Sequence, residues 1–308
     1  MIITKPTRGQ SILKDEDDLL HQPDKTLKWR ESYYFNWVDL ENKISGFSTI
    51  GIVPNEKRRE FVFLLFMDNK REFYYQEPVL EKYINDVDYM LQYKKLAFKI
   101  IKPLQTWQII YKSRKFKMNL TFETRFPNHS FGTDSSGSWH EHFEASGIIS
   151  GEMLFKDGEE RKINGYGQRD KSWGFRDWHQ FDKWFAGHFQ YKNWSAGFRK
   201  DYIGDRINLS GYVARKNENI PLTQMEIETT NDNDKLKSPL KSIYSFTDAE
   251  GKSYRIEATR IEENSYVRFA RDFLEGYTEL FEQMVFMKDL ETGEIGTGMS
   301  EQLRTVRF

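Results

Sequence analysis

Fourteen residues in the middle of the chain, GYGQRDKSWGFRDW at 165–178, gather residue types that could do chemistry. They include two Arg-Asp pairs, Arg169-Asp170 and Arg176-Asp177, with tryptophans among them. Burying several charges beside tryptophans costs free energy unless the charges pair with one another. The segment therefore predicts a paired group at the floor of a pocket, with Asp170 as an acid or base and Arg169 or Arg176 orienting it. The alternative is a structural ion pair without a chemical role.

A second candidate lies in WHEHFEASG at 139–147. On a strand, His140, His142 and Glu144 share one face at spacings of roughly 7 Å, and such a face can bind a divalent metal. No third histidine or carboxylate motif with ligand spacing accompanies them, so a strand with satisfied polar side chains is favoured and we expect no metal. Burial can instead tune His142 or Glu144 for general acid–base chemistry.

Two other site classes are disfavoured by local context. Ser172 does not lie in the G-x-S-x-G turn that exposes a hydrolase nucleophile. Gly165 and Gly167 lack the third glycine and the following helix of a dinucleotide-binding motif.

Composition narrows the function classes further. The chain has 308 residues, 38% hydrophobic and 30% charged, with a net charge of −1 and no cysteine. Such a balance is typical of a globular protein and gives no sign of a nucleic-acid partner or an anionic membrane. The lack of cysteine removes disulfides and thiol nucleophiles. Because no apolar run of about 18 residues and no signal-peptide core occur, we expect no membrane span and a cytoplasmic location.

Most of the chain has the pattern of short strands, and FKMNLTF at 116–122 alternates apolar and polar residues without a fault. Turn signals such as KDGEE at 156–160 separate the runs. The pattern predicts an all-β protein with few short helices, expected within 8–21 and 78–96. Further strands are expected at 46–53, 60–66, 106–112, 183–190, 209–214, 223–229, 241–247, 253–259 and 277–287.

A weak internal repeat suggests two related β-domains. GYGQRD at 165–170 and GTGMSE at 296–301 each place a G-x-G where a strand must bend or approach another backbone closely. We therefore expect domains at 1–178 and 179–308.

The central segment resembles the G-x-G-x-R-D-H-S-W-G-x-R-D signature of a two-domain, lipocalin-like (calycin) family. The family includes the AttH proteins, the hydroxyneurosporene synthases (carotenoid hydratases) and the fungal lipocalin-like Diels–Alderases. Three other stretches resemble family elements: ESYYFNW at 31–37, HFEASGIISGEM at 142–153 and GTGMSEQL at 296–303. The resemblance spans nearly the whole chain and is most specific at the centre.

The resemblance implies two antiparallel lipocalin-like β-barrel domains packed together. Characterised members bind apolar or polyene substrates and hydrate, cyclise or isomerise them without a redox cofactor, so no cofactor is expected here. One position departs from the signature, because Lys171 stands where the family usually has histidine. If the chemistry needs that imidazole, His142 is a replacement; if histidine only supports the site, lysine can substitute.

Three interpretations follow. In the first, an isoprenoid or polyene-like substrate enters an aromatic-lined cavity and an acid such as Asp170, Glu144 or His142 acts on it, with Arg169 and Lys171 in the catalytic group. In the second, the barrels bind or carry an apolar small molecule unchanged. In the third, the cavities are filled by the protein's own side chains. The sequence assigns no oligomeric state. The substrate-binding residues expected are Trp107, Trp139, Tyr166, Trp173, Arg176 and Asp177.

Overall fold

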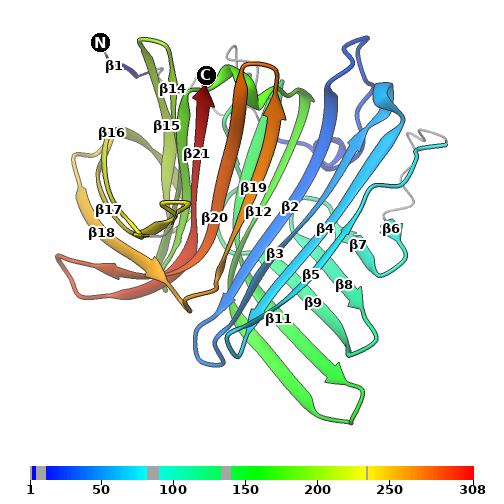
Figure 1. Ribbon diagram of the computed structural model, residues 1–308. Helices are drawn as coiled ribbons and strands as arrows, with labels where there is room; N and C mark the ends of the chain where they lie inside the picture. Colours follow the sequence, from blue (N-terminus) through cyan, green and yellow to red (C-terminus); the bar gives the residue numbers. More distant parts are fainter. Residues whose placement is uncertain (1, 5–11, 82–89, 133–139, 234) are drawn as a thin grey trace. The chain divides into compact units, whose positions relative to one another are not determined.

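The chain is built almost entirely from β-strands. The computed structural model describes residues 2–4, 12–81, 90–132, 140–233 and 235–308. Within these ranges the helical elements are three short 3-10 turns, η1 (Asp15–Asp18), η2 (Pro54–Glu56) and η3 (Trp178–Gln180) (Figure 1). No helix in the described ranges has the length and apolar character needed to span a membrane. The expected all-β class is confirmed.

The chain divides into two compact units. The N-terminal unit is Gln10–Arg176, and the C-terminal unit is Asp177–Phe308 together with strand β1 (Ile2–Thr4). The boundary falls two residues before the expected 178/179 division. Strand β1 belongs to the C-terminal unit because it pairs in parallel with Ile207–Leu209. A pairing between residues so distant in sequence leaves no local signal.

The N-terminal unit contains one 11-stranded sheet that curls into a half-barrel. Its strand order is β5-β4-β3-β2-β12-β11-β9-β8-β7-β6, with β10 paired to β11. The strands are β2 (Trp29–Asp39), β3 (Ile44–Val53), β4 (Arg58–Met67), β5 (Lys70–Gln76), β6 (Met90–Tyr93), β7 (Leu96–Lys102), β8 (Thr106–Lys112), β9 (Phe116–Thr124), β10 (His129–Ser130), β11 (Glu141–Phe155) and β12 (Glu160–Phe175).

The C-terminal unit contains a closed eight-stranded barrel. The order β15-β14-β13-β21-β20-β18-β17-β16 closes through pairing of β15 with β16, while β1 and β19 are added at the side of β15 and β20. The strands are β13 (Lys183–Gln190), β14 (Trp194–Ile203), β15 (Arg206–Arg215), β16 (Glu218–Asn231), β17 (Pro239–Asp248), β18 (Ser253–Arg260), β19 (Tyr266–Phe273), β20 (Gly276–Asp289) and β21 (Ile295–Arg307).

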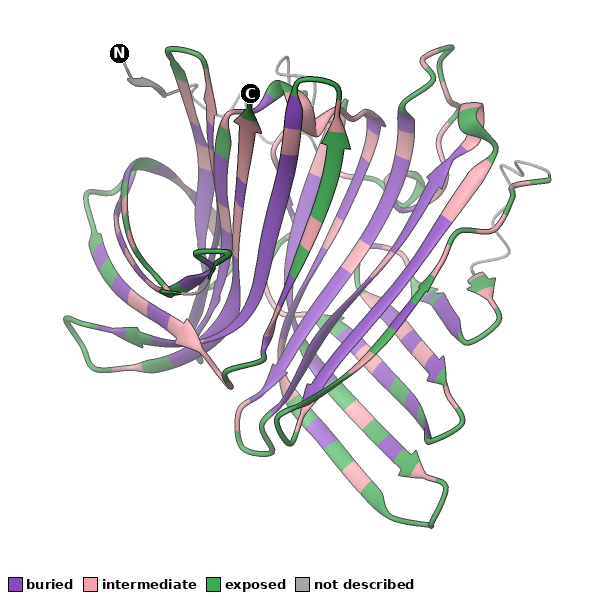
Figure 2. Cartoon of the chain, in the orientation of Figure 1, coloured by how far each residue is buried: buried purple, intermediate pink, exposed green. Residues whose placement is uncertain are grey.

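Alternating side chains build the core of each unit. The alternation expected at 116–122 is confirmed, since Phe116, Met118, Leu120 and Phe122 are buried and the residues between them are not. Figure 2 shows this banding along β8, β9 and β11, whereas β2, β3 and β4 are buried along nearly their whole length. Strands β2–β4 are therefore covered on both faces, and polar groups on them must find partners inside the protein.

The G-x-G repeat marks equivalent places in the two units. In the N-terminal unit it lies on β12, next to β2, and in the C-terminal unit it lies on β21, next to β13. A Cβ at Gly165 would collide with the backbone oxygen of Val38, and one at Gly298 with the backbone oxygen of His188. The expected close approach of two backbones is confirmed in both units.

The two expected helices are not formed in the described residues. The part of 78–96 that the structure describes contains β6 and the start of β7, joined by a turn at Lys94 with φ +47°. Leu96 is fully buried in the sheet core. Within 8–21, the described residues form only the single turn η1. At 90–96, pairing between neighbouring strands outweighed local helix propensity. Residues 82–89, in the middle of the first segment, lie outside the described residues.

Candidate active site

Strands β2, β11 and β12 carry most of the expected site residues and present them on two opposite faces. Successive side chains on a strand point to opposite sides of the sheet. Arg169, Lys171 and Trp173 therefore share one face of β12, and Asp170 lies on the other. We call the first the core face, because Arg169 and Lys171 lie fully buried there, and the second the polar face.

On the core face, Arg169 is held by Asp18 rather than by its neighbour Asp170. Its guanidinium donates through Nη1 (2.8 Å) and Nη2 to the two carboxylate oxygens of Asp18. The same carboxylate accepts the backbone N–H of Leu104 at 2.6 Å and the indole N–H of Trp107 at 3.1 Å. Burial alone would raise the pKa of Asp18, but Arg169 and these hydrogen bonds bring that pKa below its usual value. The expected Arg169–Asp170 pair is thus replaced by a buried ion pair between Arg169 and Asp18.

Lys171 lies beside this pair on the same face and contacts the carboxylate of Glu31. His21 shares that carboxylate, through its backbone N–H at 2.6 Å and its Nδ1 at 3.0 Å. The ring of Trp173 stacks on His21 with 3.7 Å between centroids. Burial lowers the pKa of Lys171 well below its usual value. Lys171 therefore lies in a closed polar cluster beneath the sheet, apart from Asp170.

The polar face carries a row of side chains at directly opposite positions on four adjacent strands. The register places His129 of β10 opposite Glu144 of β11, Glu144 opposite Asp170 of β12, and Asp170 opposite Tyr34 of β2. Opposite residues of antiparallel strands have Cβ atoms about 4.5–5.5 Å apart. Two carboxyl groups, Glu144 and Asp170, are therefore neighbours between a histidine and a tyrosine. We call these four residues the acid row.

His142 supports the acid row from the next position on β11. Its Nε2 lies 3.3 Å from Oε1 of Glu144. Phe131 packs edge-on against both His129 and His142, at 4.8 and 5.0 Å. Burial, with the nearby His142, lowers the pKa of His129 to about 3, so His129 is neutral at physiological pH. It therefore adds no positive charge beside the two carboxyl groups.

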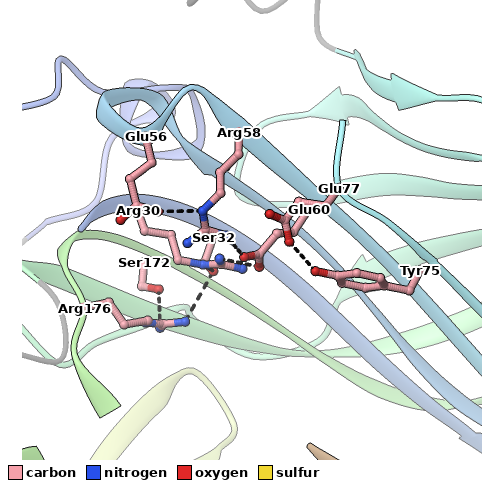
Figure 3. Close-up of polar contacts among 9 residues, drawn as sticks. All are labelled: Arg30, Ser32, Glu56, Arg58, Glu60, Tyr75, Glu77, Ser172 and Arg176. Atoms are coloured by element: carbon pink, nitrogen blue, oxygen red, sulfur yellow. Dashed lines mark hydrogen bonds and ion pairs between the residues drawn. The ribbon is translucent and has the colours of Figure 1, made fainter. Parts of the chain in front are cut away.

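One end of the polar face is closed by a ladder of arginines (Figure 3). Arg176 donates to Ser172 at 3.0 Å and to Ser32 at 3.4 Å. Arg30 also donates to Ser32, at 3.0 Å, and forms an ion pair with Glu60 at 2.5 Å. The ladder continues from Glu60 to Arg58 and from Arg58 to Glu56, while Tyr75 donates to Glu77 nearby. Ser172 is thus a hydrogen-bond partner of arginine.

The remaining expected residues are distributed rather than gathered. Trp107 and Trp173 lie on the core face, so they do not line the acid row. Tyr166 is on the polar face near its other end, with Arg125 at 4.1 Å over its ring. Asp177 accepts the backbone N–H of His179 at 3.3 Å in the C-terminal unit. Trp139 lies outside the described residues.

His140 does not join His142 and Glu144 on the strand. Strand β11 begins at Glu141, and His140 is exposed, with its backbone N–H donating to Trp173 O at 2.6 Å. Among the residues described, no group of three or more histidines, aspartates or glutamates has a geometry that could hold a metal ion.

Sequence patterns missed several residues that the fold brings to these clusters. Asp18 stands in the acidic run KDEDDLL, which is typical of a solvated surface, and His129 lies two residues after Pro127 in a loop-like stretch. Glu31 and Tyr34 lie in ESYYFNW, a stretch that indicated only the family resemblance and no site residue. A charge at an inward position of an aromatic strand, as at Glu31, is the one local signal that could have been used.

Comparison with known proteins places the fold. The chain is similar to a putative AttH (NE1406) from Nitrosomonas europaea, with 11% identity, a TM-score of 0.69, and coverage of 96% of this chain and 97% of that one. It is similar to CghA in complex with Sch210972, with 11% identity, a TM-score of 0.67 and coverage of 91% and 89%. It is also similar to kievitone hydratase from Nectria haematococca, with 9% identity, a TM-score of 0.63 and coverage of 99% and 97%.

These similarities confirm, at the level of the fold, the expected likeness to AttH proteins and related two-domain lipocalin-like proteins. No curated protein matched the sequence. A family model, described as a domain of unknown function (DUF7064), matches residues 14–306. Because this match spans both units, the chain belongs to the DUF7064 family.

Proposed function

We propose that the protein is a cofactor-independent hydratase, cyclase or isomerase that acts by acid–base chemistry on an apolar, isoprenoid or polyene-like molecule. The observation that carries the proposal is the acid row, in which Glu144 and Asp170 occupy directly opposite positions on adjacent strands. Side chains at directly opposite positions are neighbours, and a negative charge beside a carboxyl group disfavours its ionisation, so we infer that the pair shares one proton.

A shared proton suits addition of water to a carbon–carbon double bond. The protonated carboxyl gives its proton to one alkene carbon, and water bonds to the other, cationic carbon. The proton lost by that water returns to the carboxylate of the pair, so Glu144 and Asp170 end the cycle with the one proton they began with. In isomerisation the pair likewise protonates one alkene carbon, and the carboxylate then takes a proton from a carbon next to the cation rather than from water. Cyclisation uses them when a second double bond captures the cation.

The neighbours of the pair fit these roles. His142 lies against Glu144, with 3.3 Å between Nε2 and Oε1, and neutral His129 adds no positive charge that would draw the proton from the carboxyl pair. Tyr34 can donate a hydrogen bond to Asp170 from the opposite strand. Aromatic rings at Phe47, 6.0 Å from Tyr34, and Phe131 supply faces that favour a developing cation. This assignment keeps the acids expected from the sequence and replaces the expected tryptophans.

The structural neighbours support the reaction class without fixing the substrate. One is a hydratase by name, and another was crystallised with the small molecule Sch210972. Arg169 and Lys171 take positioning roles in this proposal, because both lie on the core face behind the acid row. The alternative is a binder that carries an apolar molecule unchanged, and it needs no shared proton.

The first experiment is native mass spectrometry of protein purified from its own host, with extraction of any bound molecule. Candidate substrates are then incubated with the protein in H₂¹⁸O or in D₂O. A hydratase incorporates both ¹⁸O from H₂¹⁸O and deuterium from D₂O, whereas proton-driven cyclisation or isomerisation incorporates deuterium without ¹⁸O.

The acid row is tested with Asp170→Asn and Glu144→Gln. Each substitution should abolish turnover while the melting temperature stays within a few degrees of wild type. Glu152→Gln is the matched control, because Glu152 is exposed on the same face of the same strand. Turnover that survives both substitutions would refute the acid row as the catalytic group. A bound molecule that remains unchanged in all variants would favour the binder.

A further inference from the structure

The closed barrel of the C-terminal unit has an incomplete wall. Pairing between β15 and β16 is confined to Tyr212–Arg215 and Glu218–Pro221. Nearer its start, β15 pairs with β1 instead, at Ile207–Leu209. Strand β16 is irregular between Leu222 and Gln224, just after it leaves β15. A seam thus separates β15 from the second half of β16.

A cavity of about 700 Å³ lies at this seam. Its apolar lining consists of Leu209, Met225, Phe246 and Tyr254, all buried and all members of the barrel core. Pockets that bind small molecules have volumes of about 300–1,000 Å³. The cavity is therefore large enough for a small ligand and continuous with the apolar interior of the barrel.

The side chain of Lys200, on β14, lines the same cavity and reaches β16 on the other side of the seam. Its Nζ donates to the backbone oxygen of Met225 at 2.7 Å. The cavity is also lined by the exposed Glu226, which favours the charged form of Lys200, and by Arg255 and Glu291, whose charges offset one another. Among the residues described, Lys200 has no ion-pair partner within 4.0 Å.

A second ammonium group, that of Lys183, lies next to Lys200. Lys183 Nζ is 4.6 Å from the ring centre of Tyr202 and 4.9 Å from that of Phe185, and Lys200 Nζ is 5.9 Å from Tyr202. The register puts Lys183 opposite Tyr202 and Phe185 opposite Lys200, so all four share the inner face of the barrel. Lys183 also has no carboxylate partner in the described part of the chain.

We call the edge of the barrel around Lys183 and Lys200 the rim, and this rim carries further positive charge. Arg304 lies opposite Lys183 on β21 and shares the buried carboxylate of Glu279 with Arg268. The single negative charge of Glu279 thus balances only one of the two arginines, so the rim keeps a net positive charge. Burial lowers the pKa of both Lys183 and Lys200, and the charge of Lys183 adds to the effect at Lys200. An anion bound between the two amines would stabilise their charged forms and so raise both pKa values towards the usual range.

We propose that the C-terminal barrel holds a second binding site, for an apolar chain that ends in an anionic group such as a carboxylate. The head group binds Lys200 and Lys183 at the rim, and the chain lies against Leu209, Met225 and Phe246 in the seam cavity. This site is built wholly from the C-terminal unit. It does not depend on the acid row of the N-terminal unit.

The test uses three probes with the same twelve-carbon chain: dodecanoate, dodecanol and dodecyltrimethylammonium, each below its micellar concentration. Titration calorimetry gives affinity, and methyl NMR of ¹³C-methyl-methionine protein locates the probe. The Met225 methyl signal should shift on addition of dodecanoate, while Met153, in the core of the N-terminal unit, should not. Met225→Leu assigns the signal with little structural change.

Dodecanoate should bind at least about tenfold tighter than dodecanol, since its carboxylate forms a charge-assisted hydrogen bond with Lys200 that the hydroxyl of dodecanol cannot match. Lys200→Met should remove that advantage and leave dodecanol binding unchanged. Lys288→Met, at an exposed position on β20, is the matched control and should behave as wild type. Asp170→Asn should bind dodecanoate normally, which separates this site from the proposed catalytic one.

Three results would overturn the proposal. The first is equal affinity for dodecanoate and dodecyltrimethylammonium. The second is unchanged dodecanoate affinity in both Lys200→Met and Lys183→Met. The third is a shift of Met153 in place of Met225. Failure of all three probes to bind would also reject the site, whatever the outcome for turnover at the acid row.

Discussion

The buried pair between Asp18 and Arg169 makes an unusual prediction about stability: a double substitution should cost less than either single one. Both side chains are at most 1% exposed. Removing one member of a buried ion pair strands the other charge and costs about 3–5 kcal/mol. We therefore expect Asp18→Asn and Arg169→Met each to lower the free energy of unfolding by about that amount.

The geometry around Asp18 sets the cost of the double variant. One carboxylate oxygen accepts from Leu104, Trp107 and Arg169, and the other accepts from Arg169 alone. The oxygen of an asparagine can keep the hydrogen bonds from Leu104 and Trp107, and its amide group then replaces the second oxygen. With Arg169→Met, only that amide is left unsatisfied, at a cost of about 1–3 kcal/mol.

Urea unfolding of the single and double variants at neutral pH measures this cycle, with tryptophan fluorescence as the signal. The loss should fall in the transition of the N-terminal unit. Asp68→Asn is the control, because its ion pair with Arg161 is exposed and should contribute at most about 1 kcal/mol. A double variant that loses the sum of the two single losses would refute the reasoning, as would an Asp18→Asn loss no larger than that of Asp68→Asn.

Unfolding at acid pH gives a second measurement of the pair between Asp18 and Arg169. The pKa of Asp18 in the folded protein is below its usual value of 3.8. The pair therefore stabilises the fold above pH 3.8, and this contribution is lost as the pH falls below 3.8 towards the lowered pKa. Asp18→Asn should accordingly lose less additional stability than wild type over that acid range.

Two further predictions concern the polar face. The pKa of His129 falls from 6.5 to about 3, so stability should decline as the pH falls from 6.5 towards 3; His129→Phe should flatten this decline in urea unfolding at several pH values, and an unchanged slope would contradict the assignment. A Cβ at Gly51 would overlap the guanidinium of Arg30, so Gly51→Ala should displace Arg30 from Glu60 and cost about 1–3 kcal/mol of unfolding free energy. In an Arg30→Met background the same substitution should cost less, and an equal cost would show that Arg30 is not the obstacle.

Local sequence patterns predicted most of the fold. Strict alternation at 116–122 placed a strand because a period of two matches the pleat. The G-x-G repeat indicated two related units because only glycine permits so close a backbone approach, as at Gly165 and Gly298. At the end of the helix expected in 78–96, the described residues from Met90 form β6 and the start of β7, which pair with each other as a hairpin; residues 82–89 lie outside the described residues.

The sequence by itself also determined which residues of 165–178 share a face. Asp170 could not lie on the same side of β12 as Arg169 and Lys171, because neighbouring side chains on a strand point apart. What only the tertiary structure decided is which partner each residue met. Asp18 lies 151 positions before Arg169, and Glu31 lies 140 before Lys171. Glu144 became the neighbour of Asp170 through strand register, which is set by pairing along two whole strands rather than by any short motif.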